Sequence, residues 1–160
     1  MPRKLSATLR EQVRRRAAYL CEYCHTNERW QYVRFTIDHL IPLSEAAGDA
    51  PENLALACFH CNRRKSEKLS ATDSETGELT PLFNPRQHRW SQHFIWSADG
   101  LRIIPQTTIG RVTVELLELN RQRILAIRFA DAAIGRHPPA DDPIQRSPIG
   151  PPAPSGAASL

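Results

Sequence analysis

The sequence predicts an α+β domain in which short strands and short helices follow one another closely. Three patterns predict it. Apolar residues recur every four positions near the N-terminus, they alternate with polar residues between 32 and 38, and a short apolar run precedes a polar, basic stretch between 54 and 68. The first spacing is typical of an amphipathic helix and the second of a half-buried strand.

The first predicted element is a helix over residues 9–19. Thr8 and Glu11 have the spacing of a capping box, which places a helix start directly after Thr8. The apolar face of this helix consists of Leu9, Val13 and Ala17. Its other face is basic and consists of Arg14, Arg15 and Arg16.

The next elements are two strands and a helix. Alternation from residue 32 to 38 predicts a strand that ends at Asp38, and Pro42 closes it. Gly48 begins a loop, after which residues 54–58 form a second strand and residues 61–68 a helix. The predicted order is strand, loop, strand and helix.

The second half of the chain predicts a hairpin and a further helix. Residues 73–77 have the composition of a turn-rich linker, and two short apolar runs flank the turn at 98–100. Thr108 is positioned to cap a helix that contains Val112, Leu116 and Leu119. Residues 124 and 127 either continue this helix or follow a break at Asn120.

The length of 160 residues and mass of 18.1 kDa are those of one domain. We expect residues 1–70 to form a core, 71–133 an extension that packs on it, and 134–160 a disordered tail. The tail is predicted because seven of the thirteen prolines lie beyond residue 135, with almost no large apolar side chains.

The composition excludes several classes of protein. Hydrophobic residues make up 41% of the chain and charged residues 24%, which excludes a fully disordered chain, a collagen-like fibre and a coiled coil. No apolar run approaches the roughly 20 residues that a bilayer requires, and the N-terminus has no signal-peptide core. We therefore expect a cytoplasmic protein without a membrane partner.

The four cysteines form two Cys-x-x-Cys pairs, Cys21 with Cys24 and Cys58 with Cys61. Cytoplasmic thiols stay reduced, and four thiolates are the ligand set of a structural Zn²⁺ site. The 33 residues between the pairs exceed the roughly 15 to 20 of common zinc ribbons, so the two predicted strands are an insertion. Free cysteines or a redox pair are the alternative interpretation.

The pairs frame a second motif that consists of Asp38-His39, Asn53-Leu54 and Asn62-x-x-Lys65. Together with the cysteines, over residues 8–69, this series resembles the cysteine-containing branch of the HNH endonuclease family. The resemblance implies a ββα-metal core that holds one catalytic Mg²⁺ or Mn²⁺. It further implies that Asp38 and Asn62 are ligands of that ion, that His39 is the general base, and that Asn53 holds the loop and orients His39.

These residue types also suit phosphodiester hydrolysis on chemical grounds. A neutral imidazole can take a proton from water at cellular pH. A divalent ion held by Asp38 and Asn62 would neutralise the negative charge that gathers on the phosphate and the leaving oxygen.

The net charge of +4 and pI near 9.1 are modest, but the basic residues are clustered. We expect two clusters to bind the phosphates of DNA, with RNA possible as a substrate: Arg14, Arg15 and Arg16, and Arg63, Arg64 and Lys65. Solvated helix faces are the alternative interpretation of each cluster.

For the whole protein, the alternative is a non-catalytic zinc-knuckle module that binds nucleic acid. Target sequence and oligomeric state are not predicted.

Overall fold

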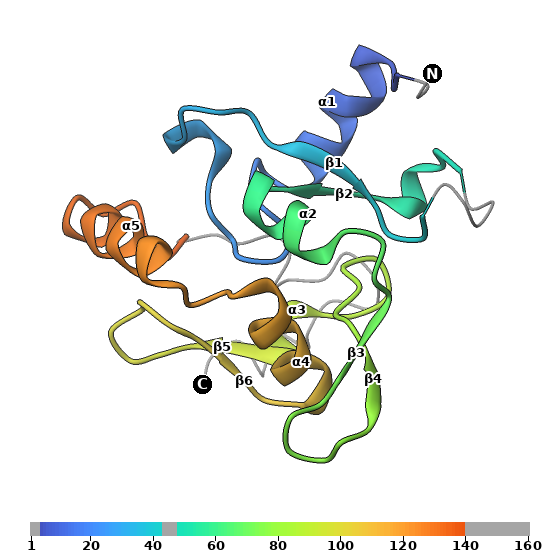
Figure 1. Ribbon diagram of the computed structural model, residues 1–160. Helices are drawn as coiled ribbons and strands as arrows, with labels where there is room; N and C mark the ends of the chain where they lie inside the picture. Colours follow the sequence, from blue (N-terminus) through green and yellow to red (C-terminus); the bar gives the residue numbers. More distant parts are fainter. Residues whose placement is uncertain (1–3, 43–47, 140–160) are drawn as a thin grey trace, which may run out of the picture.

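The computed structural model describes residues 4–42 and 48–139. In this part of the chain, short helices alternate with three two-stranded antiparallel sheets (Figure 1). The predicted α+β class is confirmed. The predicted tail from 140 to 160 lies outside the described residues.

Helix α1 (Ala7–Arg16) is capped by Ser6, whose hydroxyl accepts a hydrogen bond from Leu9 N at 3.1 Å. The predicted capping box at Thr8 is therefore wrong, and the Glu11 carboxylate instead accepts from the Tyr19 hydroxyl at 2.5 Å. The helix ends at Arg16 rather than 19. Ala18 and Tyr19 adopt left-handed φ values of 53° and 63°, which turn the chain toward the first cysteine pair.

The two predicted strands form one antiparallel pair. Strand β1 (Thr36–His39) runs beside β2 (Leu54–Ala57), with Asp38 opposite Ala55 and His39 opposite Leu54. The strand β1 begins at Thr36 rather than at 32, because the chain between a 3₁₀ turn, η1 (Glu28–Trp30), and Phe35 is bent and exposed. A second 3₁₀ turn, η3 (Pro51–Asn53), leads into β2, which is buried along its whole length.

Helix α2 (Phe59–Lys65) follows β2 directly and packs against both strands. Its N-cap is Cys58, whose sulfur accepts from Cys61 N at 3.4 Å. The helix ends at Lys65 because Ser66 adopts a φ of 52°, which the helix cannot continue. The predicted order of strand, loop, strand and helix is thus confirmed, although the helix begins two residues and ends three residues before the predicted bounds.

The second half contains two hairpins and three helices among the described residues. They are β3 (Ser70–Thr72), β4 (Leu79–Pro81), α3 (Trp90–His93), β5 (Phe94–Trp96), β6 (Ile103–Pro105), α4 (Thr108–Leu117) and α5 (Gln122–Ala133). The β5–β6 hairpin is confirmed, and a break separates α4 from α5. Residues 73–77 were expected as a linker but form the turn of the β3–β4 hairpin, where Gly77 N bonds to Asp73 O at 2.8 Å.

One hydrophobic core runs through both halves of the chain. It joins Val13, Leu54 and Leu56 from the first half to Trp90 and Leu117 from the second. Asn120, at the break between α4 and α5, bonds through its amide to both Ile103 N and Ile103 O at 2.7 Å. Because the core contains residues of both halves, the elements from β3 to α5 pack directly on the elements from α1 to α2.

Two residues within the predicted tail, Arg136 and His137, contact the folded part of the protein. The Arg136 guanidinium lies 4.0 Å from the centre of the Trp30 ring. His137 Nε2 lies 2.6 Å from Gly100 O, so the chain is attached to the fold at least to this point. Within the described ranges, none of the helices has the length and apolarity needed to cross a membrane.

Candidate functional site

The four cysteines meet in the interior of the protein. Their sulfur atoms all lie within 4.8 Å of one another, and Cys24 Sγ and Cys58 Sγ are 3.8 Å apart. A tetrahedral zinc ion with bonds of about 2.3 Å would place its sulfurs about 3.8 Å apart, so the donor set fits zinc. The cysteines are positioned to bind a metal such as zinc, and none is in a disulfide.

The two cysteine pairs come from different local structures. Cys21 and Cys24 lie in a tight loop after α1, which His25 closes with a φ of 58° and with a bond from its N to Cys21 O at 2.9 Å. Cys58 and Cys61 lie on the first turn of α2. Hydrogen bonds from the neighbouring cysteine thiols hold the pKa of Cys24 well below its usual value, whereas burial raises that of Cys21. A bound ion would therefore fix α2 to the loop after α1.

Residues between the first two cysteines connect this cluster to the second half of the chain. Buried Glu22 accepts from Leu56 N at 2.8 Å and forms an ion pair with Arg86. Burial raises the pKa of Glu22. The Trp90 indole donates to Tyr23 O at 3.1 Å. Sequence analysis did not identify these contacts because each joins residues far apart along the chain.

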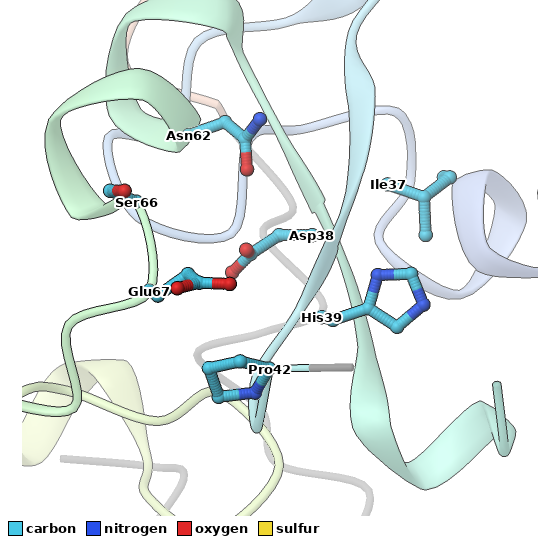
Figure 2. Close-up of a pocket in the computed structure, with 7 residues that line it drawn as sticks. All are labelled: Ile37, Asp38, His39, Pro42, Asn62, Ser66 and Glu67. Carbon is cyan, nitrogen blue, oxygen red and sulfur yellow. The ribbon is translucent and has the colours of Figure 1, made fainter. Parts of the chain in front are cut away.

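A pocket of about 230 Å³ opens between β1 and α2. Its lining consists of Ile37, Asp38, His39, Pro42, Asn62, Ser66 and Glu67. In Figure 2, the Asp38 carboxylate and the Asn62 amide point into the space between strand and helix, and His39 extends from the other side of β1. The structure thus brings together three residues that the sequence motif singled out.

The Asp38 carboxylate is buried and has two partners. The Tyr23 hydroxyl donates to Oδ2 at 2.8 Å, and Lys65 Nζ lies 3.3 Å from the same oxygen. Burial raises the pKa of Asp38, and the Lys65 ammonium opposes this shift. Lys65 therefore favours the ionised carboxylate that a metal ligand needs.

The imidazole of His39 is fixed by an aspartate that the sequence analysis did not single out. His39 Nε2 lies 2.8 Å from Asp49 Oδ1. An ionised carboxylate only accepts hydrogen bonds, so Nε2 carries the proton and, in the neutral ring, the lone pair is on Nδ1. The two residues are ten positions apart across a loop, a relationship without a sequence signature.

Asn53 fixes the loop between β1 and β2 through its side chain. The amide oxygen accepts from Ile41 N at 2.8 Å, and the amide nitrogen donates to Ile41 O and Gly48 O, each at 3.0 Å. These contacts join the two ends of the loop, consistent with a loop-holding role. The imidazole of His39 has Asp49 as its partner, so any effect of Asn53 on His39 acts through the backbone.

Glu67 is the pocket residue that the sequence analysis missed. Its side chain lines the same pocket as Asp38, and Figure 2 draws both. The turn at Ser66 after the end of α2 brings it there. An acidic residue two positions after Lys65 is the available sequence signal, and it is weak because exposed glutamates are common.

The basic residues expected to bind phosphates differ in burial and in their partners. Arg14 and Lys65 are buried, and their charges are paired with Glu28 at 3.1 Å and Asp38 at 3.3 Å. Both cations are engaged by carboxylates inside the protein, so we do not propose them for phosphate contact. Arg15 and Arg63 are exposed.

The remaining two arginines stabilise other parts of the fold. Arg16 donates to Pro51 O at 2.9 Å and Leu54 O at 2.5 Å. Arg64 donates to Leu116 O at 3.0 Å, near the end of α4. Arg16 is partly exposed and Arg64 is exposed, and for each of them a phosphate would have to replace or share a bond to a backbone carbonyl.

Comparison with known proteins agrees with this geometry. The model of the HNH endonuclease family matches residues 21–68, a segment that contains all four cysteines and the pocket residues. The resemblance to this family is confirmed for that segment, which indicates nuclease-type activity or nucleic-acid binding. Among curated proteins and among solved structures, none matches the chain significantly.

Proposed function

We propose that this protein is a metal-dependent HNH endonuclease that hydrolyses phosphodiester bonds in DNA. One observation carries the proposal: Asp38, His39 and Asn62 line a single pocket within the segment that matches the family model. The strands β1 and β2 and the helix α2 would then be the ββα-metal core, and the elements from β3 to α5 an extension packed on it.

The pocket has the donors that a hard divalent cation prefers. Asp38 and Asn62 offer oxygen atoms, Glu67 adds a second carboxylate, and the pocket leaves room for water and a phosphate. Mg²⁺ and Mn²⁺ bind such oxygen donors and keep open positions. Asp38 and Asn62 would hold the ion, whose charge would offset the negative charge that develops on the phosphate.

His39 has the arrangement of a general base. Asp49 holds Nε2–H, so Nδ1 is the atom that accepts a proton from the attacking water. Lys65 and Tyr23 favour the ionised form of the Asp38 carboxylate and hold its orientation. The four-cysteine site would bind Zn²⁺ in a structural role and fix α2, which carries Asn62.

The exposed arginines Arg15 and Arg63 are the cations that we propose for phosphate binding, with Arg16 and Arg64 as partial contributors. RNA has the same phosphate backbone, so the substrate test includes both nucleic acids.

The alternative is a zinc-containing module that binds nucleic acid without cutting it. The family match and the cysteine cluster are compatible with both functions. The buried carboxylate of Asp38, which lines a pocket with a histidine and an amide, favours the nuclease, because burying a carboxylate costs free energy that binding alone does not require.

Cleavage of supercoiled plasmid and of a labelled RNA in Mg²⁺ or Mn²⁺ tests the proposal. We expect the parent to nick or linearise plasmid, and Asp38→Asn and Asn62→Ala to lose at least a hundredfold in rate. The matched control is Glu78→Gln, an exposed carboxylate on the second half of the chain. Binding without cleavage by the parent, with zinc bound, would support the alternative instead.

A further inference from the structure

Residues 29–34, from within η1 to the chain just before β1, expose apolar side chains to an unusual degree. Tyr32 is fully exposed, at 104% of its reference area, and Val33 and Trp30 are exposed by 64% and 43%. Three neighbouring exposed apolar side chains on one loop leave a hydrophobic surface that a ligand or partner can cover. We call this segment the η1–β1 loop.

Buried contacts fix both ends of the η1–β1 loop. At its start, Glu28 forms an ion pair with Arg14 and accepts from Phe35 N at 2.6 Å, across the whole loop. At its end, Phe35 is 6% exposed and belongs to the hydrophobic core. The loop is therefore held in shape, and its apolar side chains are presented to solvent by a fixed frame. Such preorganisation lowers the entropic cost of binding.

The charge of the η1–β1 loop indicates what it binds. Arg29 and Arg34 are exposed, and the Arg136 guanidinium lies 4.0 Å from the centre of the Trp30 ring. Residues 29–36 contain no acidic residue, and the Glu28 carboxylate before them is neutralised by Arg14. Exposed aromatics among cations suit a polyanion with stacking bases.

A protein partner is less well supported. Tyrosine, tryptophan and arginine are also enriched at protein interfaces. A protein surface complementary to three exposed cations would have to be strongly acidic, whereas a nucleic acid supplies both the phosphates and the flat apolar faces.

The position of the η1–β1 loop relative to the pocket agrees with binding of the same nucleic acid. Tyr32 is six residues before Asp38, so the two are at most about 20 Å apart. Successive phosphates of one DNA strand advance by about 3.4 Å along the helix axis, so this span covers about six nucleotides. Figure 1 shows the loop at the end of the molecule where β1 begins.

We propose that the η1–β1 loop contacts bases of the substrate next to the cleavage position, with Tyr32 and Val33 against a base and Arg29, Arg34 and Arg136 on the flanking phosphates. This inference rests on the proposed function and names a second contact region of the same protein. A kinked duplex and a single strand both present such unstacked bases.

The test compares the parent with Tyr32→Ser/Val33→Ser, using Leu79→Ser as the control because Leu79 is a 73% exposed apolar residue on another hairpin. Affinity is measured for a 20-base-pair duplex and a 20-nucleotide single strand, without Mg²⁺ or Mn²⁺. Duplexes with 2-aminopurine at successive positions report unstacking as increased fluorescence. Zinc content and thermal unfolding establish that each variant is folded.

We expect the double variant to lose roughly tenfold or more in affinity and to abolish the fluorescence increase, with Leu79→Ser unchanged. A loss of affinity for the duplex would mean that Tyr32 and Val33 act as a wedge at a kink. A loss of affinity for the single strand alone would mean that they form a stacking platform. This inference would be overturned if the parent cleaves DNA and the folded double variant has an affinity for both probes within twofold of that of the parent. The proposed function would then remain intact. The inference would also be overturned if the parent self-associates, the double variant does not, and the two have the same affinity for the nucleic-acid probes. A parent without any nucleic-acid binding would refute the proposed function itself.

Discussion

The Lys65 ammonium lies 3.3 Å from Asp38 Oδ2, and both side chains are almost completely buried. The lysine comes from the last turn of α2 and the aspartate from β1, so the ion pair connects the helix to the strand on which the pocket depends. A buried ion pair adds little net stability, but removal of one partner leaves an unpaired charge in the interior.

Lys65→Met should therefore destabilise the protein by about 3 kcal/mol at pH 8, measured by chemical denaturation without added Mg²⁺. Burial already raises the pKa of Asp38, and loss of the ammonium that opposes this shift raises it further. A raised carboxyl pKa in the folded state means that stability decreases as the pH rises through it. The loss of stability in the variant should thus become smaller as the pH falls from 8 toward the raised pKa of Asp38. A deficit independent of pH would show that Asp38 is not the group affected.

Asp49→Asn tests how His39 is held. The amide can turn its NH₂ toward Nε2 and thereby favour the wrong tautomer, so we expect the cleavage rate to decrease at least tenfold with DNA affinity and zinc content unchanged. Asp49→Glu should recover part of the rate. The control Asp99→Asn, in the exposed β5–β6 turn, should cleave as the parent does. Equal rates for Asp49→Asn and the parent would exclude the positioning role.

The cysteine cluster predicts one zinc ion per chain. Cys58→Ser should lose the metal and unfold or aggregate, because the binding free energy of a structural zinc is folding free energy, of order 10 kcal/mol. Elemental analysis and circular dichroism measure the two effects. A folded, reduced parent without zinc would contradict this prediction.

Burial separates the arginines that we propose for phosphate binding from Arg14, which supports the fold. Arg15→Ala and Arg63→Ala should each reduce the slope of log affinity against log salt by roughly one, without loss of stability. Arg14→Ala should instead destabilise the protein, since it leaves buried Glu28 unpaired. An unchanged salt slope in both exposed variants would show that neither arginine contacts a phosphate.

The sequence predicted those parts of the fold that depend on neighbours along the chain. Alternation before Asp38 and the apolar run at Leu54 located β1 and β2, and the Cys-x-x-Cys spacing located the metal cluster. It could not predict the contacts that fold topology creates between distant positions, such as Asp49 beside His39. The same limit applies to the burial of Lys65, because a basic run on a short helix does not show which of its members points into the interior.

Local backbone conformation produced the remaining differences. The left-handed residues Ala18 and Tyr19 end α1 three residues before the predicted boundary, and neither residue type indicates such a turn. Ser6 caps α1 instead of Thr8, and the sequence does not decide between them because serine and threonine are both favoured N-cap residues. Glu67 reaches the pocket because Ser66 turns the chain after α2, which no periodicity predicts.

Plasmid cleavage by His39→Ala in Mg²⁺ or Mn²⁺ tests the claim that His39 is the general base of a nuclease. We expect the variant to lose at least a hundredfold in cleavage rate, while its zinc content, thermal stability and DNA affinity match those of the parent. Cleavage by a purified His39→Ala variant at the rate of the parent, with contaminating nuclease excluded, would contradict the claim.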